Sequence, residues 1–403
     1  MKVLHVIPSV SPLRGGPSEA VLQMVRALQA QGITAEIVTT NDDGAGILHV
    51  PLNEWLEYPD QAPVPIRFFP RFSPSIPALR EFAFSGSLAL WLWQHMAEYD
   101  LVHVHAVFSA ASTIAMVIAR LQNVPYIVRP LGQLCHWSLQ QGHHKKQLYL
   151  QLIERANLNQ AQLIHFTSDQ EQQEALQLGL KPPGFVLPHG LVMPPYLPNA
   201  KAQLRQYLNL PLEEPIVLFL SRLHPKKGLD YLIPALSQLQ GHRFTFVLAG
   251  NATPEYESEV QQLLQATGLI AQTRRMGFVQ GETKTLLLQG ADLFVLTSHS
   301  ENFGIAVLEA MAHGLPVLIT PGVALASLVK RSHLGWVTPL DQATITHTLQ
   351  QVFDNLPLAN HMGECARHLV EQHYSWHHIA THLIQQYHSA LFQPSLELPP
   401  SLP

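Results

Sequence analysis

The feature of this sequence that most constrains its fold is an alternation of short apolar runs with helical patterns, which occurs twice along the chain. The runs are apolar throughout, as strands covered on both faces should be. Strands that alternate with helices imply right-handed crossovers and parallel sheets. Helical patterns lie between most of the runs, for example at Pro17–Gln31 and Leu229–Leu239. We therefore predict two series of strands, the first at Val3–Ile7, Ala35–Thr39, Ile66–Phe69, Leu101–His105, Tyr126–Arg129, Leu163–Thr167 and Phe185–Leu187, and the second at Ile216–Ser221, Phe244–Ala249, Arg275–Phe278, Leu293–Thr297, Pro316–Ile319 and Gly335–Val337.

A proline-rich segment, LPHGLVMPPYLPNA, lies between the two series and has no periodicity, which indicates a linker near residues 188–200. The length of 403 residues also favours two domains over one core. We predict an α/β protein with two doubly wound, Rossmann-like domains, 1–190 and 200–375, which face each other across a cleft. A helix is expected at 376–392, and residues 393–403 resemble a frayed tail.

Composition excludes several classes of protein. The formal net charge of -5 disfavours a nucleic-acid binder, which would neutralise phosphates with basic side chains. Only two cysteines occur, Cys135 and Cys365, which excludes a disulfide framework and favours a reducing cytoplasm. The 23 histidines are scattered and lack the Cys/His spacing of a zinc site. We expect a cytoplasmic globular protein.

Membrane signals are weak in this sequence. No stretch reaches the ~18 uninterrupted apolar residues of a spanning helix. The N-terminal MKVLHVIPSV does not fit a signal peptide, because His5 and Pro8 interrupt its apolar run. The basic, helical segment QGHHKKQLYLQ (141–151) leaves two options open: a solvated face, or peripheral contact with anionic lipid or a lipid-diphosphate acceptor at the inner face of a membrane.

Ligands of doubly wound sheets bind beyond the carboxyl ends of the strands, so the loops after the strands are the places to search. Gly15 and Gly16 follow the first strand and can bring backbone amides close to an anion such as a diphosphate. An ordinary tight turn with a helix cap is the alternative.

His103 and His105 lie on one face of the fourth strand. His105 is nearer the carboxyl end and is the better candidate for a ligand contact, although a structural histidine is the alternative.

Cations follow the first strand of the second half. Arg222 and Lys227 stand beside Gly228 and a helix start, which suits a phosphate leaving group. The alternative is a pair of solvated charges. Lys226 is the natural control, because we expect its side chain to face water.

Two carboxylates occur in SENFGIAVLEAMAHGLPVLIT (300–320). Glu301 lies in the loop after a buried strand, beside the amides of Asn302, Phe303 and Gly304. Glu309 lies in the second turn of the next helix, where it faces either the same cleft or solvent. Two such acceptors suit a ligand with several hydroxyl groups. The acid/base pair of a glycoside hydrolase is the competing interpretation. The cations of the second half favour a phosphorylated sugar donor over a plain glycan.

Four motifs on four loops support a family resemblance: RGGP, HVHA, SRLHPKKG and the E-x7-E form ENFGIAVLE. Together they resemble, in order and over nearly the whole chain, the retaining nucleotide-sugar glycosyltransferases of the GT4 family, which have the GT-B fold. The stretches RPLGQLCHWSL and LIERANLNQA resemble a bacterial subgroup that assembles cell-surface polysaccharides. The resemblance implies a hexosyltransferase that moves a hexose from a nucleotide-diphosphate sugar to a hydroxyl of a glycan or lipid-linked acceptor.

The resemblance also implies roles for domains and residues. Domain 1–190 would hold the acceptor, domain 200–375 the nucleotide sugar, and the helix 376–392 would cross back to the first domain. The diphosphate would be bound by Arg222, Lys227, Gly15 and Gly16; the ribose by Glu309; and the donor sugar by Glu301, His105 and the amides of Asn302, Phe303 and Gly304.

Members of the family typically need no metal, and we expect no metal and no further cofactor. The pair Asp42 and Asp43 is better explained as turn chemistry than as a metal-binding motif. Asn251 and the loop TPGVALASLV depart from the family pattern near the nucleotide, so the base is left open. Two other functions also stay open: a sugar-nucleotide epimerase, and a catalytically retired binding or scaffold subunit.

Overall fold

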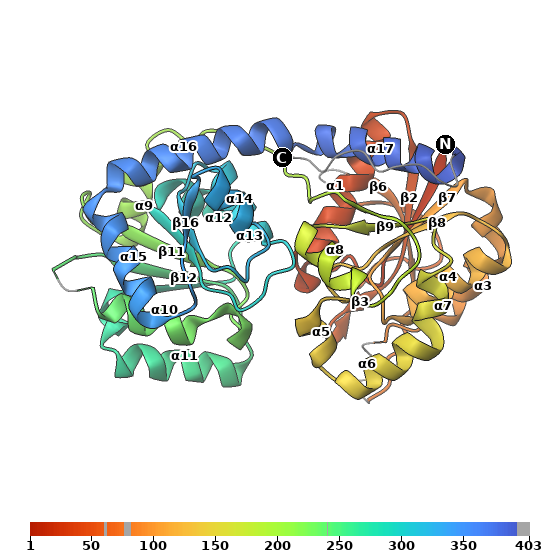
Figure 1. The fold of residues 1–403 in the computed structure, drawn as a ribbon, viewed down its shortest axis with the longest axis horizontal. Helices are drawn as coiled ribbons and strands as arrows, with labels where there is room; N and C mark the ends of the chain where they lie inside the picture. The colour runs from red at the N-terminus through yellow and green to blue at the C-terminus, as the bar shows by residue number, and fades with distance from the viewer. Residues whose placement is uncertain (60–62, 76–81, 240, 393–403) are drawn as a thin grey trace. The chain divides into compact units, whose positions relative to one another are not determined.

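The computed structural model describes residues 1–59, 63–75, 82–239 and 241–392 (Figure 1). Contacts divide the chain into two compact units, which are treated separately below. Unit 1 comprises Met1–Gly190 and the C-terminal segment from Trp376 onward, and unit 2 comprises Leu191–Ser375. Residues 188–199 contain neither helix nor strand apart from an isolated bridge between Leu191 and Ser375. The predicted tail, 393–403, lies outside the described residues.

Unit 1 is built on an eight-stranded sheet of order β10-β9-β8-β7-β1-β2-β6-β5, parallel except for β5. Its strands are β1 (Lys2–Val6), β2 (Thr34–Thr40), β5 (Trp55–Tyr58), β6 (Val64–Phe69), β7 (Leu101–His105), β8 (Tyr126–Arg129), β9 (Leu163–Phe166) and β10 (Gly184–Val186). Its helices include α1 (Gly16–Ala30), α3 (Gly86–His95), α4 (Ala110–Leu121), α5 (His136–Gln140), α6 (His143–Tyr149), a π-helical turn (Leu150–Glu154), α7 (Arg155–Leu158), α8 (Asp169–Leu176) and α17 (Trp376–Phe392).

Helix α17 belongs to unit 1 although it comes last in the chain. It packs against α1, and Figure 1 shows the two side by side in blue and red. Its apolar face completes a core cluster with β1, β2 and β6 through Ile379, Leu383 and Tyr387, which are all fully buried. Burial of such side chains stabilises the unit by roughly 1.5–3 kcal/mol each.

Unit 2 is built on a six-stranded parallel sheet of order β13-β12-β11-β14-β15-β16 around one core cluster. Its strands are β11 (Ile216–Leu220), β12 (Thr245–Ala249), β13 (Thr273–Gly277), β14 (Leu293–Leu296), β15 (Val317–Ile319) and β16 (Gly335–Val337). Its helices include α9 (Ala200–Leu208), α10 (Leu229–Ser237), α11 (Pro254–Ala266), α12 (Gly281–Gly290), α13 (Ile305–Ala312), α14 (Ala326–Arg331), α15 (Gln342–Asp354) and α16 (Leu356–His373). The prediction of two doubly wound α/β folds is confirmed.

Each sheet has a topological switch point beside its first strand. In unit 1, β1 lies between β2 and β7, and in unit 2, β11 lies between β12 and β14. Loops that leave the two neighbouring strands in opposite directions create a crevice there, where doubly wound folds bind ligands. The loop after β1 carries Gly15, and the loop after β7 begins directly after His105. The loop after β11 carries Lys227, and the loop after β14 carries Glu301.

Candidate active site

The loop after β11 is pressed against the end of β14. It ends in a short 3-10 turn, Pro225–Lys227, and Gly228 then adopts a left-handed conformation with φ 67°. A Cβ atom on Gly228 would lie 2.0 Å from the carbonyl oxygen of Thr297, so only glycine permits this approach. The Thr297 hydroxyl donates a hydrogen bond of 2.9 Å to the carbonyl of Gly228. The contact places the side chain of Lys227 next to the loop after β14.

Lys227 and Glu301 form an ion pair at the switch point of unit 2. The Ser298 hydroxyl also donates to the same carboxylate oxygen at 3.2 Å. The side chains of Lys227 and Glu301 are 13% and 16% exposed, so the pair is mostly buried but open to solvent on one side. The structure thus brings together a cation and a carboxylate that lie 74 residues apart in the sequence.

Arg222 belongs to the same loop after β11 as Lys227 and is exposed. In the described part of the chain it forms no hydrogen bond and no ion pair. His224 caps the following turn, where its Nδ1 accepts the Lys226 N–H at 3.1 Å. Burial lowers the pKa of His224, and the positive charges of Arg222, Lys226 and Lys227 lower it further. The loop is therefore a concentrated positive region in which the histidine stays neutral.

Two glycines bring the neighbouring loops close to the same edge. A Cβ atom on Gly250 would lie 1.8 Å from the Ser221 carbonyl oxygen, and one on Gly322 would lie 2.3 Å from that of His299. The Gly322 carbonyl also accepts the Glu301 N–H at 2.7 Å. The loops of Asn251 and TPGVALASLV, which depart from the family pattern, therefore still help to shape this edge.

Helix α13 follows Glu301 and begins after Gly304, which has φ 91°. The backbone amides at the start of a helix lack partners within the helix and favour negative ligands. The Phe303 side chain is buried in the core of unit 2, so only its backbone is a candidate for ligand contact. Asn302 is partly exposed beside it.

Glu309 forms an ion pair of 2.6 Å with Lys284 of α12. Sequence reasoning had not identified Lys284, because its pairing depends on the packing of α12 against α13. One turn further on, His313 bonds through Nδ1 to the Glu309 carbonyl at 2.7 Å. Burial lowers the pKa of His313 to about 4.

The glycine loop of unit 1 is held by a buried carboxylate. Gly15 has φ 84° and joins a 3-10 turn to α1, in which Gly16 is the first residue. Asp42 is 1% exposed and pairs with Arg14 at 2.6 Å and with Arg71. The predicted turn at Asp42 is a small hairpin of β3 (Asp42–Asp43) and β4 (Gly46–Ile47), and its first carboxylate anchors the loop. Arg71, which is remote in sequence, was not predicted.

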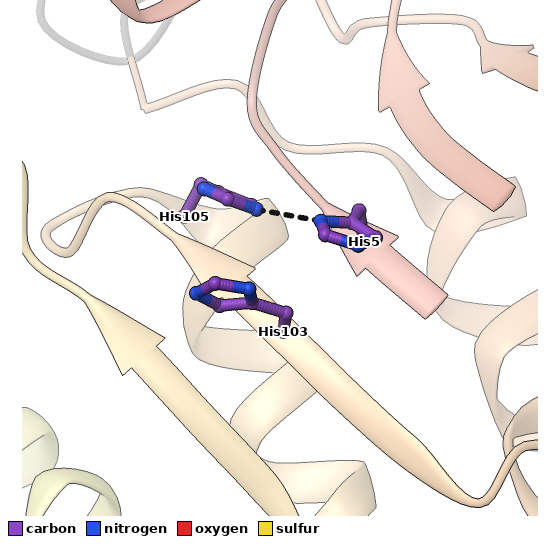
Figure 2. A group of neighbouring side chains, drawn as sticks. All are labelled: His5, His103 and His105. Atoms are coloured by element: carbon purple, nitrogen blue, oxygen red, sulfur yellow. Dashed lines mark hydrogen bonds between the residues drawn. The ribbon is translucent and has the colours of Figure 1, made fainter. Parts of the chain in front are cut away.

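His5 of β1 and His103 and His105 of β7 form a buried cluster (Figure 2). The ring centroids of His103 and His105 lie 4.4 Å apart, so both side chains are on one face of the sheet. His105 is 1% exposed, and its Nε2 lies 3.0 Å from Nδ1 of His5. Burial holds the pKa of His105 well below its ordinary value, with further contributions from His5 and Arg129. His105 is therefore neutral.

The cluster is the only group of three or more potential metal ligands found among the described residues, with ligand atoms within 4.8 Å of one another. Two of its ring nitrogens, His5 Nδ1 and His105 Nε2, lie 3.0 Å apart, which is the distance of a hydrogen bond between the rings. The buried guanidinium of Arg129 also disfavours a cation here. The arrangement fits hydrogen bonding better than metal coordination.

The loops after β7 and β8 contain strained backbone. Ala106, Phe108 and Leu131 have φ values of 68°, 56° and 56°, which side chains of this size rarely adopt. The Val107 N–H donates to Gln133 Oε1 at 2.6 Å and ties the two loops together. Strain of this kind concentrates at functional sites. It gave no signal in the sequence, because none of these residues is typical of a left-handed position.

Two family models match this chain. The model described as "Glycosyl transferase 4-like domain" matches residues 15–190, and "Glycosyl transferases group 1" matches residues 200–369. The chain belongs to the GT4 family of glycosyltransferases. The predicted family, and with it an enzyme of glycosyltransferase type, is confirmed.

Known glycosyltransferases resemble the chain in sequence over part or nearly all of its length. It is 25% identical over 416 residues to a GDP-mannose:cellobiosyl-diphosphopolyprenol alpha-mannosyltransferase of Xanthomonas oryzae pv. oryzae. This alignment covers 98% of the present chain and 99% of the Xanthomonas protein. An uncharacterized glycosyltransferase of Methanocaldococcus jannaschii is 31% identical over 193 residues, which are 47% of this chain and 49% of that relative. The sequence relationship is thus extended but distant.

Solved structures establish the GT-B fold of this glycosyltransferase. A sucrose-phosphate synthase from Thermosynechococcus elongatus matches with a TM-score of 0.79 and 22% identity, over 98% of this chain and 100% of that one. Anabaena HepE in complex with UDP-glucose matches with a TM-score of 0.76 and 22% identity, over 96% and 100%. None of the described helices is long and apolar enough to span a membrane.

Proposed function

We propose that this glycosyltransferase moves a hexose from a nucleotide-diphosphate sugar to a hydroxyl of a glycan or lipid-linked acceptor, with retention of anomeric configuration, in cell-surface polysaccharide biosynthesis. The observation that carries the proposal is the ion pair of Lys227 and Glu301 at the switch point of unit 2. The exposed Arg222 lies in the same loop after β11 as Lys227. A diphosphate needs fixed cations, and a sugar needs acceptors for its hydroxyl groups. This edge of the sheet offers both.

The physical task of such a transfer is to stabilise the departing diphosphate. The bond between the sugar and the phosphate breaks through an oxocarbenium-like state, and the acceptor hydroxyl attacks from the same face. Lys227 and Arg222 bind the negative charge that develops on the leaving group. Glu301 holds the Lys227 ammonium in place and accepts hydrogen bonds from the sugar. The amides at the start of α13 contribute further donors.

Other residues complete the proposed donor site. Glu309 accepts hydrogen bonds from the ribose hydroxyls, and Lys284 fixes its carboxylate. The amide of Gly16 binds a phosphate oxygen at the start of α1, and Gly15, whose own N–H donates to the Pro12 carbonyl at 3.0 Å, lets the exposed backbone come close to the phosphate. His105 contacts the transferred sugar. We propose that neither a metal nor a further cofactor takes part in the reaction. Treatment with EDTA should therefore leave turnover unchanged.

Relatives support the donor and acceptor classes. HepE is described in complex with UDP, with UDP and glucose, and with UDP-glucose. The Xanthomonas relative is named for a mannosyl donor and a diphosphopolyprenol acceptor, and a further fold relative, WaaG, for lipopolysaccharide biosynthesis. Those proteins point to a nucleotide sugar and to a lipid-linked or surface glycan.

An exposed segment of unit 1 supports peripheral contact with a membrane that carries the acceptor. Leu148 and Leu152 are 59% and 71% exposed, and the exposed Lys145 lies one turn before Leu148. Apolar side chains beside ammonium groups suit the surface of an anionic membrane. Co-sedimentation with phosphatidylglycerol vesicles, but not with phosphatidylcholine vesicles, is expected. We expect the double variant Leu148→Ser/Leu152→Ser to lose this binding. Equal binding of the wild type to both kinds of vesicle would contradict the proposed membrane contact.

A thermal-shift panel of UDP, GDP, ADP and their sugars, followed by mass spectrometry of products, tests the function. A shift with one nucleotide and a glycosylated product with release of the nucleoside diphosphate are expected. Interconversion of sugars without nucleotide release would indicate an epimerase. Nucleotide binding without transfer across a broad acceptor panel would indicate a scaffold subunit.

A further inference from the structure

Hydrogen bonds inside unit 1 determine which ring nitrogen of His103 carries its proton. His165 Nε2 lies 2.8 Å from the Leu187 carbonyl, which can only accept, so this nitrogen carries the proton. His165 Nδ1 therefore accepts from Nε2 of His103 at 3.4 Å, and Nδ1 of His103 accepts from the Tyr387 hydroxyl at 2.8 Å. Burial keeps both histidines neutral, with pKa values well below the ordinary range. Both nitrogens of His103 are thus occupied, and it cannot bond to its two neighbours.

His5 and His105 consequently form an isolated pair, joined by the 3.0 Å contact between His5 Nδ1 and His105 Nε2 in Figure 2. Two neutral rings have two N–H groups, and the contact uses one of them. His5 Nε2 is sealed from solvent and has no hydrogen-bond partner. His105 Nδ1 also has no hydrogen-bond partner among the described residues, but unlike His5 Nε2 it is not fully buried from solvent.

The two possible directions of the bond differ in where they leave the second proton. If His105 donated, His5 Nε2 would be a sealed, unpaired N–H, and such orphan donors are rare in proteins. If His5 donates, the sealed atom is only an unused acceptor, which is better tolerated. The second N–H then lies on His105 Nδ1, at the carboxyl end of β7, where a ligand can accept it.

We propose that the Nδ1–H group of His5 donates a hydrogen bond to Nε2 of His105. This bond holds His105 as a neutral ring whose Nδ1–H group donates to an oxygen of the bound sugar or diphosphate. His5 is then a positioning residue that never touches the substrate. His105 cannot act as a general base through Nε2, because that lone pair is already used. The assignment of a ligand contact to His105 rests on the proposed function, whereas the direction of the bond does not.

The test uses two variants of equal size. His5→Asn places an amide N–H₂ donor near the position of Nδ1, and His5→Asp places a carboxylate there that can only accept. With ¹³C,¹⁵N-labelled histidine, solid-state NMR reports the protonated nitrogen of His105, whose signal is the one missing in His105→Ala. We expect Nδ1–H in the wild type and in His5→Asn, and Nε2–H in His5→Asp.

Turnover is then measured with the nucleotide sugar that gives the largest thermal shift, as release of nucleoside diphosphate. We expect His5→Asn to keep turnover within about threefold of the wild type, and His5→Asp to lower kcat by about 10²-fold with KM for the donor nearly unchanged. Circular dichroism spectra of both variants are compared with that of the wild type to check that the variants are folded.

Several results would overturn the proposal. An Nε2-protonated His105 in the wild type contradicts the direction of the bond whether or not the enzyme is active. Equal kcat in His5→Asn and His5→Asp contradicts the positioning role. Stoichiometric Zn²⁺ binding by the wild type that is lost in both variants means that the lone pairs bind metal instead. A wild type without transfer activity refutes the proposed function, while the NMR result still decides the tautomer.

Discussion

Replacing Lys227 with alanine perturbs both the fold of unit 2 and the proposed chemistry, and the two effects can be separated. The substitution removes the ammonium group that pairs with Glu301 and leaves the carboxylate with the Ser298 hydroxyl at 3.2 Å. Breaking fully buried pairs costs about 3–5 kcal/mol, and exposed pairs cost about 0–1 kcal/mol. With the side chains 13% and 16% exposed, we expect about 2 kcal/mol of lost stability.

The effect on catalysis is expected to be larger than the effect on stability. Removal of one preorganised donor to a developing negative charge costs about 3 kcal/mol, or roughly 10²-fold in kcat. Turnover is measured as release of nucleoside diphosphate, well below the melting temperature of the variant, so that unfolding does not contribute. Lys227→Ala should therefore be folded, moderately less stable, and about 10²-fold slower.

Lys226→Ala is the matched control, because it removes the same charge from the neighbouring position. The Lys226 backbone carbonyl, which accepts the His299 N–H at 2.9 Å, is unchanged by the substitution. We expect turnover within about twofold of the wild type, since a cation that does not contact the leaving group contributes little. Equal losses in Lys226→Ala and Lys227→Ala would refute the assignment of the cationic site.

Further predictions concern the same unit. Arg222→Ala should lower kcat by about 10²-fold without lowering the melting temperature, since its side chain is exposed; unchanged kcat would exclude Arg222 from phosphate binding. Gly228→Ala should destabilise the chain more than Gly268→Ala, because both have positive φ but only the first would meet a carbonyl oxygen, that of Thr297, at 2.0 Å; similar melting temperatures would contradict this packing. Because the pKa of His313 is lowered from 6.5 to about 4, only the unfolded chain gains its proton as the pH falls below 6.5. The free energy of unfolding should thus fall by about 2 kcal/mol between pH 7 and pH 5 through this group, and urea titrations of His313→Gln should lack that part of the slope.

Strands covered on both faces were predictable from the sequence. Leu101–His105 and Tyr126–Arg129 have the predicted bounds, because their residues are all buried and apolar runs mark them clearly. The prediction failed where burial alternates. Strand β5 was missed, and β13 was predicted to begin two residues late and to end one residue late, since exposed and less exposed side chains alternate along both of these edge strands.

The candidate site was predictable only in part. The motifs identified Lys227 and Glu301 separately, but their ion pair depends on the order of β11 and β14 in the sheet and on the close contact at Gly228. The same holds for Lys284, which reaches its partner carboxylate only through packing of two helices, and for His5, whose strand lies next to that of the histidine it bonds. Partners from different elements leave no local pattern in a single sequence.

The central claim is that cations of the loop after β11 bind the donor diphosphate while the carboxylates of the E-x7-E motif bind hydroxyl groups. A crystal structure of the enzyme with the nucleotide sugar that gives the largest thermal shift tests it most directly. The account predicts phosphate oxygens within hydrogen-bond distance of Arg222 and Lys227, with Glu309 on the ribose and Glu301 on the sugar. A nucleotide bound elsewhere, with these four side chains free of it, would contradict the account.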